Sequence, residues 1–564
     1  MTSSPALTVT LALGRPRFKD AAHAALAGAG QLNAAWQSLL GPAWPDADRL
    51  ARALETVAGD FAVAATSADG GVLLAIDRFA MQTLCWRHDG GTVRYAPRAD
   101  AWAGDGLALS RQSLFDYLYF HAIPSPQTIY EGVSRLEPAH LLLHHQGRTQ
   151  LRRYWQPRFQ PTARPDLASL KQRFLDAVEQ GVRDELDGSL PACFLSGGTD
   201  SSTVAGMVAR LAGGVDSFSI GFEAQGYDEM AYARIAAKHF GARHHEHYVT
   251  PDELVRHIPA VATHYDQPFG NSSALPAFCC AQVARQQGVT RMLAGDGGDE
   301  LYGGNARYAT QRVFGWYRQV PQPLRSGLLE PLFLRRWAGT LMPTRKVRSY
   351  IEQAREPMPA RLQQYNLLLR LGPAEVLTPA FLSGIDSAEP LHHQQAVWAA
   401  NPAADELNTA LAYDWRYTLA ESDLPKVRET CALAGVGVGF PMLAQALLDL
   451  SLELPADYKL KGMKLRWFFK ESLRGFLPDE ILTKSKHGFG LPFGHWALKH
   501  AGLGALATDS LNSLVRRGVV RADFIRPLLE QHLPAYPGYY GEMVWILMML
   551  EQWLRGHEPD YRWQ

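Results

Sequence analysis

The hydrophobic and polar positions form two different patterns along the chain. Up to about residue 155, short apolar runs such as LTVTLAL, DFAVAAT and HLLLHHQG are separated by glycine and Asp-Gly turns. This is the pattern of β-strands joined by tight turns. It predicts an antiparallel, β-rich domain over residues 1–156, followed by a Pro- and polar-rich linker at 157–169.

Beyond the linker, strand-like runs alternate with amphipathic helices. The helix pattern LKQRFLDAVEQGVRDEL leads to the apolar run PACFL, and further strand and helix patterns follow as far as VTRMLAG at 289–295. Such alternation predicts an open parallel α/β sheet with functional turns at the strand C-ends. From about residue 310 the periodicity is mainly helical, and the apolar run at 544–554 predicts a buried terminal helix. We therefore expect residues 170–564 to form an α/β domain with a helical C-terminal extension.

Composition narrows the functional classes. Lys+Arg and Asp+Glu both number 56, so the chain lacks the basic excess typical of a general nucleic-acid binder, and we expect no nucleic-acid partner. Five cysteines without a C-x-x-C pair argue against a disulfide framework or a structural zinc site, and fit a reducing compartment. The N-terminus lacks the features of a signal peptide, and no apolar run approaches about 18 residues. These features predict a cytoplasmic protein with no membrane contact.

The first chemical signal is the turn S-G-G-T-D-S-S at 196–202, which joins a strand to an Ala/Val/Met-rich helix. Glycine amides, hydroxyls and the unpaired amides of a helix N-terminus can cradle a diphosphate. The carboxylate of Asp200 would repel a phosphate, but it suits a Mg²⁺ ion that bridges phosphates. The turn therefore indicates an enzyme that releases pyrophosphate; the alternative is a capped helix start with a tight turn.

Two further segments carry candidate chemistry. In AGDGGDELYGG, Asp296, Asp299 and Glu300 lie within five residues, as expected of a second metal ligand beside a proton acceptor, although alone they fit a surface turn. Lys484 and Lys486 precede a Gly-Phe-Gly-Leu-Pro turn, where a lysine can stabilise developing negative charge. Upstream, KLKGMKLRWFFK adds Lys461, Lys464 and Arg466. On composition alone, such basic residues are more often solvated than catalytic.

Other clusters have simpler interpretations. In HHEHYV, His245 and His247 share one face of a predicted strand, with His244 on the other. Without further ligands nearby, structural or solvent-facing roles are favoured over a zinc site. Cys279 and Cys280 lie in an Ala/Phe-rich helix pattern and are expected to pack in the core.

Taken together, the motifs resemble those of a known enzyme family. S-G-G-x-D-S, S-I-G-F, D-Q-P-x-x-x-S-S-A-L-P, G-D-G-G-D-E-L-Y-G-G and K-x-G-F-x-x-P occur in order over most of 170–500. They resemble the synthetase domain of glutamine-dependent asparagine synthetases, a group that also includes β-lactam synthetases and lasso-peptide cyclases. The N-terminal part resembles the family's Ntn-hydrolase-type glutaminase sandwich through G-D-F-A-V-A, L-A-I-D-R and L-E-P-A-H.

The resemblance implies an ATP-pyrophosphatase (PP-loop) fold, with ATP and Mg²⁺ as cofactors and an acyl-adenylate intermediate. Matched by position, Asp200 and Asp299 would hold Mg²⁺, Asp296 would be the acid/base residue, and Lys486 would stabilise the charged transition states. The residues implied at the nucleotide are Leu195, Ile220 and Gly221, Ala294 and Gly295, and, for the pyrophosphate, Ser196, Gly197, Gly198, Ser201 and Ser202.

The chain departs from the family at two places. The glutaminase cysteine is expected at position two, but this sequence has Thr2 there and no cysteine before Cys85. We therefore expect no glutaminase nucleophile and a degenerate glutaminase domain retained as a scaffold. Between residues 427 and 445, the family's Glu, Arg and Asp are replaced; Gly437, Gly439 and Ala444 stand at those positions. Together with Gln267, which replaces a common Glu, this makes aspartate a doubtful substrate.

The leading hypothesis is an ATP-dependent amide ligase that couples an adenylated carboxylate to an amine not produced by its own glutaminase. Intramolecular closure, as in a lasso peptide, macrolactam or β-lactam, is its most specific form, with a precursor peptide or biosynthetic protein as partner. An asparagine-synthetase paralogue using ammonia or a separate glutaminase is the main alternative. A tRNA-modifying PP-loop enzyme would predict a basic face, and a non-enzymatic binding module would predict a damaged site. A homodimer is one candidate assembly.

Overall fold

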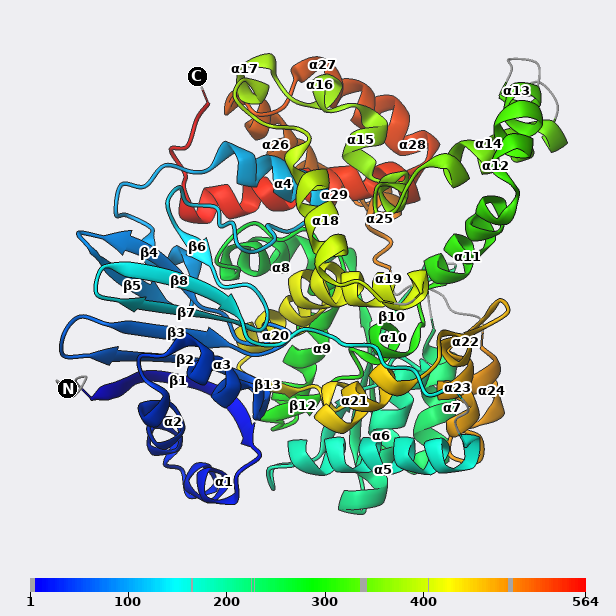
Figure 1. Cartoon of the computed structure of the whole chain (residues 1–564). Coiled ribbons are helices and arrows are strands. Elements are labelled where there is room, and N and C mark those ends of the chain that lie inside the picture. The colour runs from blue at the N-terminus through cyan, green and yellow to red at the C-terminus, as the bar shows by residue number, and fades with distance from the viewer. Residues whose placement is uncertain are drawn as a thin grey trace.

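The computed structural model describes residues 6–163, 166–224, 226–227, 229–334, 342–403, 405–484 and 490–563. Its N-terminal part is built on two antiparallel sheets, as the spacing of apolar runs predicted (Figure 1). The larger sheet has the order β1 (Leu7–Phe18), β2 (Val57–Ser67), β3 (Val72–Ile76), β7 (His140–His145), β8 (Arg148–Arg153). The smaller has the order β5 (Thr92–Ala96), β4 (Cys85–Asp89), β6 (Ser134–Arg135).

Both faces of the larger sheet are covered because alternate residues of a strand point to opposite sides. Phe61 and Val63 of β2 pack with Trp36, whereas Ala62 and Ala64 pack with Leu84 and the smaller sheet. Trp36 belongs to a group of short helices inserted between β1 and β2: α1 (Ala21–Gly28), α2 (Leu32–Leu40) and α3 (Ala47–Glu55). The expectation of a β-rich N-terminal part missed these helices, since each has only eight or nine residues.

The second part contains the predicted parallel sheet. Its order is β11 (Arg243–Val249), β10 (Asp216–Phe222), β9 (Ala192–Phe194), β12 (Arg291–Leu293), β13 (Gly437–Gly439), and every adjacent pair is parallel. The chain first builds outward from β9 and then returns to its other side with β12. In such a sheet, ligands bind at the carboxyl ends of the strands where the order reverses. This point lies between β9 and β12, the two strands that precede the glycine turns.

Helices cover both faces of this sheet. One core contains α5 (Leu167–Glu185), α6 (Thr199–Ala212) and α7 (Met230–Phe240), together with Phe468 and Phe469. The other face packs against α9 (Ala274–Gln286), whose adjacent Cys279 and Cys280 are both buried as predicted.

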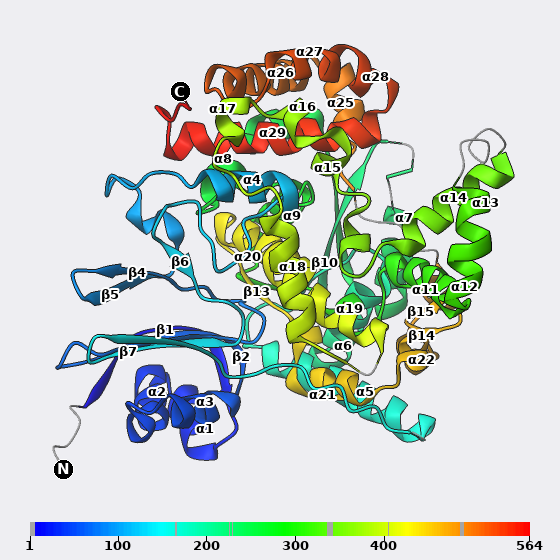
Figure 2. The same cartoon turned by 45° about the horizontal axis from the view of Figure 1, so that its top comes forward.

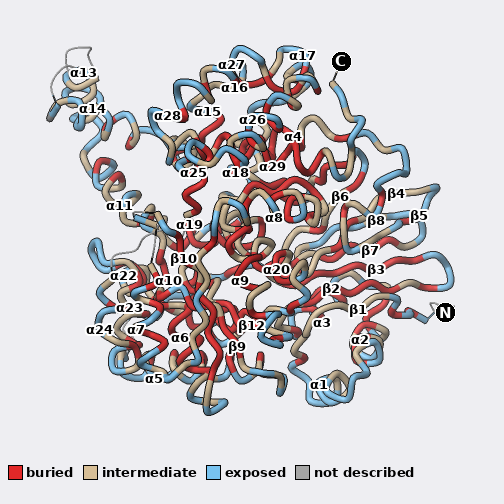
Figure 3. Tube along the Cα trace, turned by 180° about the vertical axis from the view of Figure 1, so that it is seen from behind, coloured by how far each residue is buried: buried red, intermediate tan, exposed pale blue. Residues whose placement is uncertain are grey.

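The C-terminal extension is organised around α29 (Pro537–His557; Figure 1), and the middle of this helix is buried (Figure 3). It packs on α8 (Pro251–His264), α25 (Phe493–Lys499) and α26 (Ala501–Arg516). An added Cβ at Gly541 would lie 2.7 Å from the Cα of Gly494, so glycine permits the close approach of α25 and α29. None of the helices in the described part of the chain combines the length and hydropathy of a membrane span.

A helical arm extends to one side of the molecule, away from the N-terminal sheets (Figure 2). It includes α11 (Ala306–Gln319), α12 (Gln322–Leu324), α13 (Glu330–Phe333) and α14 (Met342–Arg355). The arm is less buried than the sheets (Figure 3).

Candidate active site at the two glycine turns

The two glycine turns meet at the carboxyl edge of the parallel sheet. Leu293 at the end of β12 pairs with Cys193 of β9, so the chain leaves both strands at the same level. A Cβ on Gly295 would lie 2.7 Å from the amide nitrogen of Ser201 and 2.9 Å from the carbonyl carbon of Asp200. Only a residue without a side chain therefore lets the second turn reach the start of α6.

A cavity of about 390 Å³ opens where these turns meet. The sequence-predicted residues that line it are Leu195, Ser196, Gly198, Asp200, Ser201, Ile220, Gly295, Asp296 and Asp299. Within the first turn, the Ser196 and Ser201 hydroxyls are 3.1 Å apart, and the Ser201 hydroxyl also donates to the Gly198 carbonyl. Local hydrogen bonds therefore hold the turn in shape at the N-terminus of α6.

The remaining predicted nucleotide residues lie behind the described lining of this cavity. Gly197, at φ +70°, packs closely against Tyr232, and Ser202 is completely buried in α6. Gly221 faces the ring of Tyr248. Ala294 donates its amide to the Gly439 carbonyl at 2.9 Å. The predicted transition-state lysine, Lys486, lies outside the described residues.

The carboxylates predicted to hold magnesium share one guanidinium. Arg466 pairs with Asp200, and its Nη1 lies 2.7 Å from Oδ1 of Asp299. Burial opposes the charge of Arg466, but the two carboxylates outweigh it and raise the pKa of the guanidinium. Lys461 and Lys464, its neighbours in the basic segment, are exposed. Of that segment, Arg466 is therefore the residue brought to the site.

The donor set at this point fits a magnesium ion. Two carboxylates from neighbouring glycine turns provide the hard oxygen ligands that Mg²⁺ takes alongside substrate phosphates and water. Among the residues that the structure describes, no group of three or more acidic, histidine or cysteine side chains forms an all-protein metal cage. Asp200 and Asp299 would therefore supply only part of the coordination, as is usual for magnesium on a nucleotide.

Asp296 faces a lysine and a second carboxylate from a distant part of the chain. Nζ of Lys426 lies 3.3 Å from Oδ1 of Asp296 and 3.0 Å from Oδ1 of Asp423. Burial raises the pKa of Asp296 and Lys426 opposes the shift, whereas the two carboxylates overcome burial and raise the pKa of the lysine. Asp423 ends the π-helix η6 (Trp415–Asp423), and Lys426 belongs to α20 (Leu424–Leu433). Neither residue was predicted from the sequence, where the local signal is an acid and a lysine three positions apart.

Lys484 lies near the rim of the cavity. Its Nζ is 2.9 Å from Oε1 of Glu229, which lines the cavity, and 4.5 Å from the ring centre of Tyr232. This lysine is nearly buried, so of the two lysines before the Gly-Phe-Gly turn the described one is paired rather than solvated.

The segment that departs from the family forms the edge strand β13. A Cβ on Gly439 would lie 2.5 Å from Oε2 of Glu185 and 2.7 Å from Nη2 of Arg291, which are ion-paired with each other. A larger side chain at 439 would displace this pair. Within the described lining, Gly437, Gly439 and Ala444 contribute nothing to the nucleotide cavity. Gln267 is likewise buried elsewhere, beside the Ile123 carbonyl.

The three histidines of β11 have separate partners. His244 lies 2.9 Å from the Ser217 hydroxyl, and His247 lies 2.8 Å from Glu253. His245 contacts Asp216 and stacks on Phe218. These contacts agree with the structural role favoured for this cluster.

The family model described as asparagine synthase matches residues 172–555, which include both glycine turns. The chain belongs to the asparagine synthase family. A second model, described as a glutamine amidotransferase domain, matches residues 50–155. Membership of the asparagine synthase family makes the chain an ATP-dependent carbon–nitrogen ligase, the enzyme class that the motifs predicted.

Individual relatives share a low sequence identity with this chain, but two of the alignments cover most of it. Asparagine synthetase [glutamine-hydrolyzing] 1 of Bacillus subtilis is 22% identical over 454 residues, covering 80% of this chain and 70% of that protein. A Mycobacterium bovis protein, provisionally named asparagine synthetase [glutamine-hydrolyzing], is 26% identical over 471 residues, covering 80% of this chain and 68% of that protein. Amidase chyE of Penicillium rubens is 27% identical over 274 residues, covering 44% of this chain and 40% of that protein.

Proposed function

We propose that this ligase adenylates a carboxylate and couples it to an amine that its own N-terminal domain does not generate. In the first step, a carboxylate oxygen attacks the α-phosphorus of ATP, and the bond to the β-phosphate breaks to release pyrophosphate. In the second, the amine attacks the acyl carbon, AMP leaves, and the amine proton passes to a base. The meeting of both glycine turns at one cavity, with Asp200 and Asp299 side by side, is the observation that carries the proposal.

Each turn has a distinct part in this reaction. The amides and hydroxyls of Ser196, Gly198 and Ser201 bind the departing pyrophosphate at the start of α6. Asp200 and Asp299 would hold Mg²⁺, which would supply positive charge to offset that of the phosphates. Arg466 pairs with the same two carboxylates and so offsets their charge in the absence of a nucleotide.

Asp296 accepts the proton of the attacking amine. Burial raises its pKa, which makes its carboxylate a stronger base than an exposed aspartate. Lys426 keeps that carboxylate ionised and fixes its position at 3.3 Å. Lys486 is the residue we assign, from its position in the family motif, to transition-state stabilisation.

Two observations support an amine source other than the N-terminal domain. The matched amidotransferase region begins at residue 50 and so excludes β1 and most of the inserted helices. All five cysteines are buried, and burial raises their thiol pKa, to about 12 for Cys279, so none offers a thiolate.

The acyl substrate we favour is a peptide or another amino-acid-derived carboxylate rather than aspartate. Gly437, Gly439 and Ala444 stand where the family pattern has charged residues, and none of them reaches the described cavity lining. Intramolecular closure of a peptide, as in lasso-peptide or macrolactam formation, is the specific reaction we propose. Formation of asparagine from aspartate, with ammonia or nitrogen supplied by a separate glutaminase, is the second candidate, favoured by the names of the Bacillus subtilis and Mycobacterium bovis relatives.

ATP–[³²P]pyrophosphate exchange over a panel of carboxylates tests the proposal. The panel contains aspartate, glutamate, carboxyethyl amino acids and candidate precursor peptides, with glutaminase activity measured in parallel. We expect exchange with one class of carboxylate, a loss of at least 100-fold in Asp200→Asn, and no glutamate from glutamine. Asp252→Asn is the matched control because the Asp252 side chain is 79% exposed and is not part of the described cavity lining. Exchange that survives Asp200→Asn would contradict the assignment of the first turn.

A further inference from the structure

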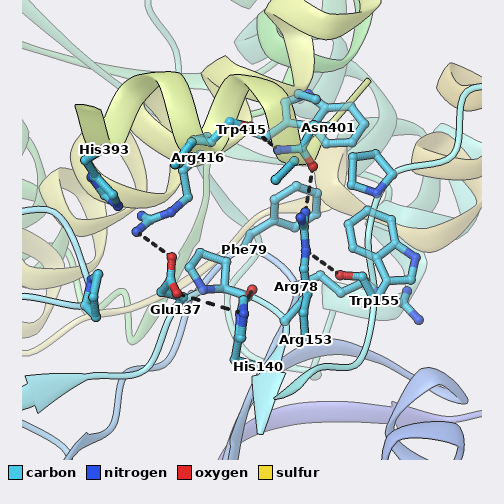
Figure 4. A pocket seen from close by; sticks show the side chains of 18 residues that line it. Arg78, Phe79, Glu137, His140, Arg153, Trp155, His393, Asn401, Trp415 and Arg416 are labelled. Carbon is cyan, nitrogen blue, oxygen red and sulfur yellow. Dashed lines mark hydrogen bonds and ion pairs between the residues drawn. The ribbon is translucent and has the colours of Figure 1, made fainter. Parts of the chain in front are cut away.

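A second cavity of about 400 Å³ lies between the N-terminal sheet and the helical part of the synthetase domain (Figure 4). Its walls come from the loop after β3, the segment before β7, the end of β8, α18 (Glu389–Ala400) and the start of η6. Among the described residues, it shares no lining side chain with the nucleotide cavity. An adjoining cavity of about 590 Å³ shares Arg78, Arg153 and Trp155 with it, so these side chains form a common wall.

Two arginines on this wall lack an acidic partner. In the part of the chain that the structure describes, no carboxylate lies within ion-pair distance of Arg78 or Arg153, and Nε of Arg78 is buried without a hydrogen bond. Arg78 donates to the Glu55 carbonyl at 2.8 Å. Arg153 donates to the Trp155 carbonyl at 3.0 Å and to Oδ1 of Asn401 at 2.8 Å. Both guanidiniums are therefore held in place by neutral groups. Carboxylates act on them only from beyond ion-pair distance, Asp449, Asp77 and Glu55 on Arg78 and Glu137 on Arg153, and burial still lowers the pKa of each arginine.

The other ionisable groups of the cavity do not cancel this charge. Glu137, which lies near Arg153, is 3.5 Å from Arg416, and Arg416 also pairs with Glu421. Burial lowers the pKa of His140, which lies 3.9 Å from Glu137, and lowers that of His393 to about 4, so the His393 ring is neutral at neutral pH. The cavity thus carries a net positive charge that favours an anion.

The remaining wall is apolar and largely aromatic. Phe79 and Trp415 meet edge to face with ring centres 6.1 Å apart. The guanidinium of Arg78 lies 5.4 Å from the ring centre of Trp155, and Val397 adds an aliphatic surface from α18. Apolar walls with a few fixed polar groups are typical of small-molecule sites, and a volume of this order suits one small ligand.

We propose that this cavity binds a small organic anion, with carboxylates on Arg78 and Arg153 and a flat apolar body against Trp155, Phe79 and Trp415. A planar guanidinium binds carboxylate and phosphate alike, but the aromatic walls favour an aromatic carboxylate over a bare inorganic anion. This site goes beyond the proposed reaction, because it neither contacts the nucleotide cavity nor needs ATP.

The cavity is nevertheless linked to the nucleotide cavity by a hydrogen bond and by a shared helix, both through Trp415. The indole N–H of Trp415 donates to the Glu300 carbonyl in the second glycine turn at 2.9 Å. Trp415 also begins η6, which ends at Asp423, beside Lys426 and Asp296. An anion in contact with Trp415 would therefore contact η6, the helix whose last residue, Asp423, lines the nucleotide cavity.

Isothermal titration of the full chain with isophthalate, without ATP, tests the site. Isophthalamide has the same flat ring without the charges, and inorganic phosphate has the charge without the ring. We expect isophthalate to bind at least tenfold more tightly than either compound, and Arg153→Gln to weaken it at least tenfold. Arg526→Gln, an arginine whose side chain is 80% exposed, is the matched control and should leave binding unchanged.

A second variant keeps the test decisive if Arg153→Gln fails to fold. Ala396→Trp adds a bulky side chain at the cavity wall from an exposed position and leaves both arginines in place, so it should also abolish isophthalate binding. Equal binding of isophthalate and isophthalamide, or binding that survives both variants, would overturn the proposal. Phosphate binding as tight as isophthalate would overturn the aromatic part. None of these results depends on pyrophosphate exchange, so they are separable from failure of the proposed reaction.

Discussion

Lys459, at the end of α22 (Ala456–Lys459), is almost completely buried, with 1% of its surface exposed. Its ammonium donates to Oδ1 of Asn408 at 2.8 Å and lies 4.8 Å from the ring centre of Phe159. Burial lowers the pKa of this lysine to about 7, because neither neighbour compensates a full positive charge. Between about pH 7 and the ordinary lysine range, the unfolded chain therefore holds a proton that the folded chain does not.

This proton difference gives a prediction for stability. The free energy of unfolding should rise with pH above 7, by at most about 1.4 kcal/mol per pH unit from this group. Lys459→Met removes that contribution, so the melting temperature of the variant relative to wild type should be higher at pH 7 than at pH 9. Differential scanning calorimetry at both pH values measures this. Lys464→Met, at an exposed position, is the control, and equal pH dependence for the two variants would contradict the prediction.

At the scale of elements, the active site depends on how closely two turns approach each other. β12 delivers the second turn onto the first residues of α6, and Gly295 is the contact point. The sequence predicted the strands at both turns, because each is a short apolar run that ends in glycines. It did not predict β13, since Gly437–Gly439 carries no strand pattern and pairs only because β12 lies beside it.

A single methyl group should therefore disturb the site. In Gly295→Ala, the added carbon would lie 2.7 Å from the Ser201 nitrogen, an overlap that costs about 1–3 kcal/mol when neighbours must shift. Because Ser201 and Asp200 would move, we expect the KM for ATP in pyrophosphate exchange to rise at least tenfold. Gly214→Ala is the control, since no atom lies within 4 Å of its added carbon. An unchanged KM in Gly295→Ala would show that the turn tolerates the shift.

At the scale of the whole molecule, the N-terminal part and the synthetase part are joined by buried contacts. Arg135 of β6 pairs with Glu421 of η6 at 2.6 Å, and Arg17 of β1 pairs with Glu185 of α5 at 2.5 Å. Tyr117, in α4 (Arg111–Phe120), donates to the Ile546 carbonyl of α29 at 2.8 Å. In the predicted linker, the backbone amide of Gln160 donates to the Leu452 carbonyl at 3.0 Å, so this part of it lies against the synthetase part. The last three residues of the predicted range, 167–169, instead begin α5.

Cutting this linker should leave the two parts together. With a protease site inserted after Ala163, we expect the cleaved pieces to elute as one species in size-exclusion chromatography. The reason is that the contacts between them are buried and do not depend on chain continuity. Uncleaved protein carrying the same insertion controls for the insertion itself. Separate elution of the pieces at physiological salt would mean that the linker, rather than the interface, holds the molecule together.

The sequence by itself determined the alternating strands and helices, the glycine turns and the candidate carboxylates Asp200, Asp296 and Asp299. These features are local, because strand periodicity and turn type depend on residues that are adjacent in the sequence. Only the tertiary structure brought Arg466 between two of those carboxylates and Lys426 beside the third. Each lies more than a hundred residues from those carboxylates, and its role arises from packing that no local pattern encodes. The arginines of the second cavity have the same origin, since strands and helices far apart in the chain enclose them.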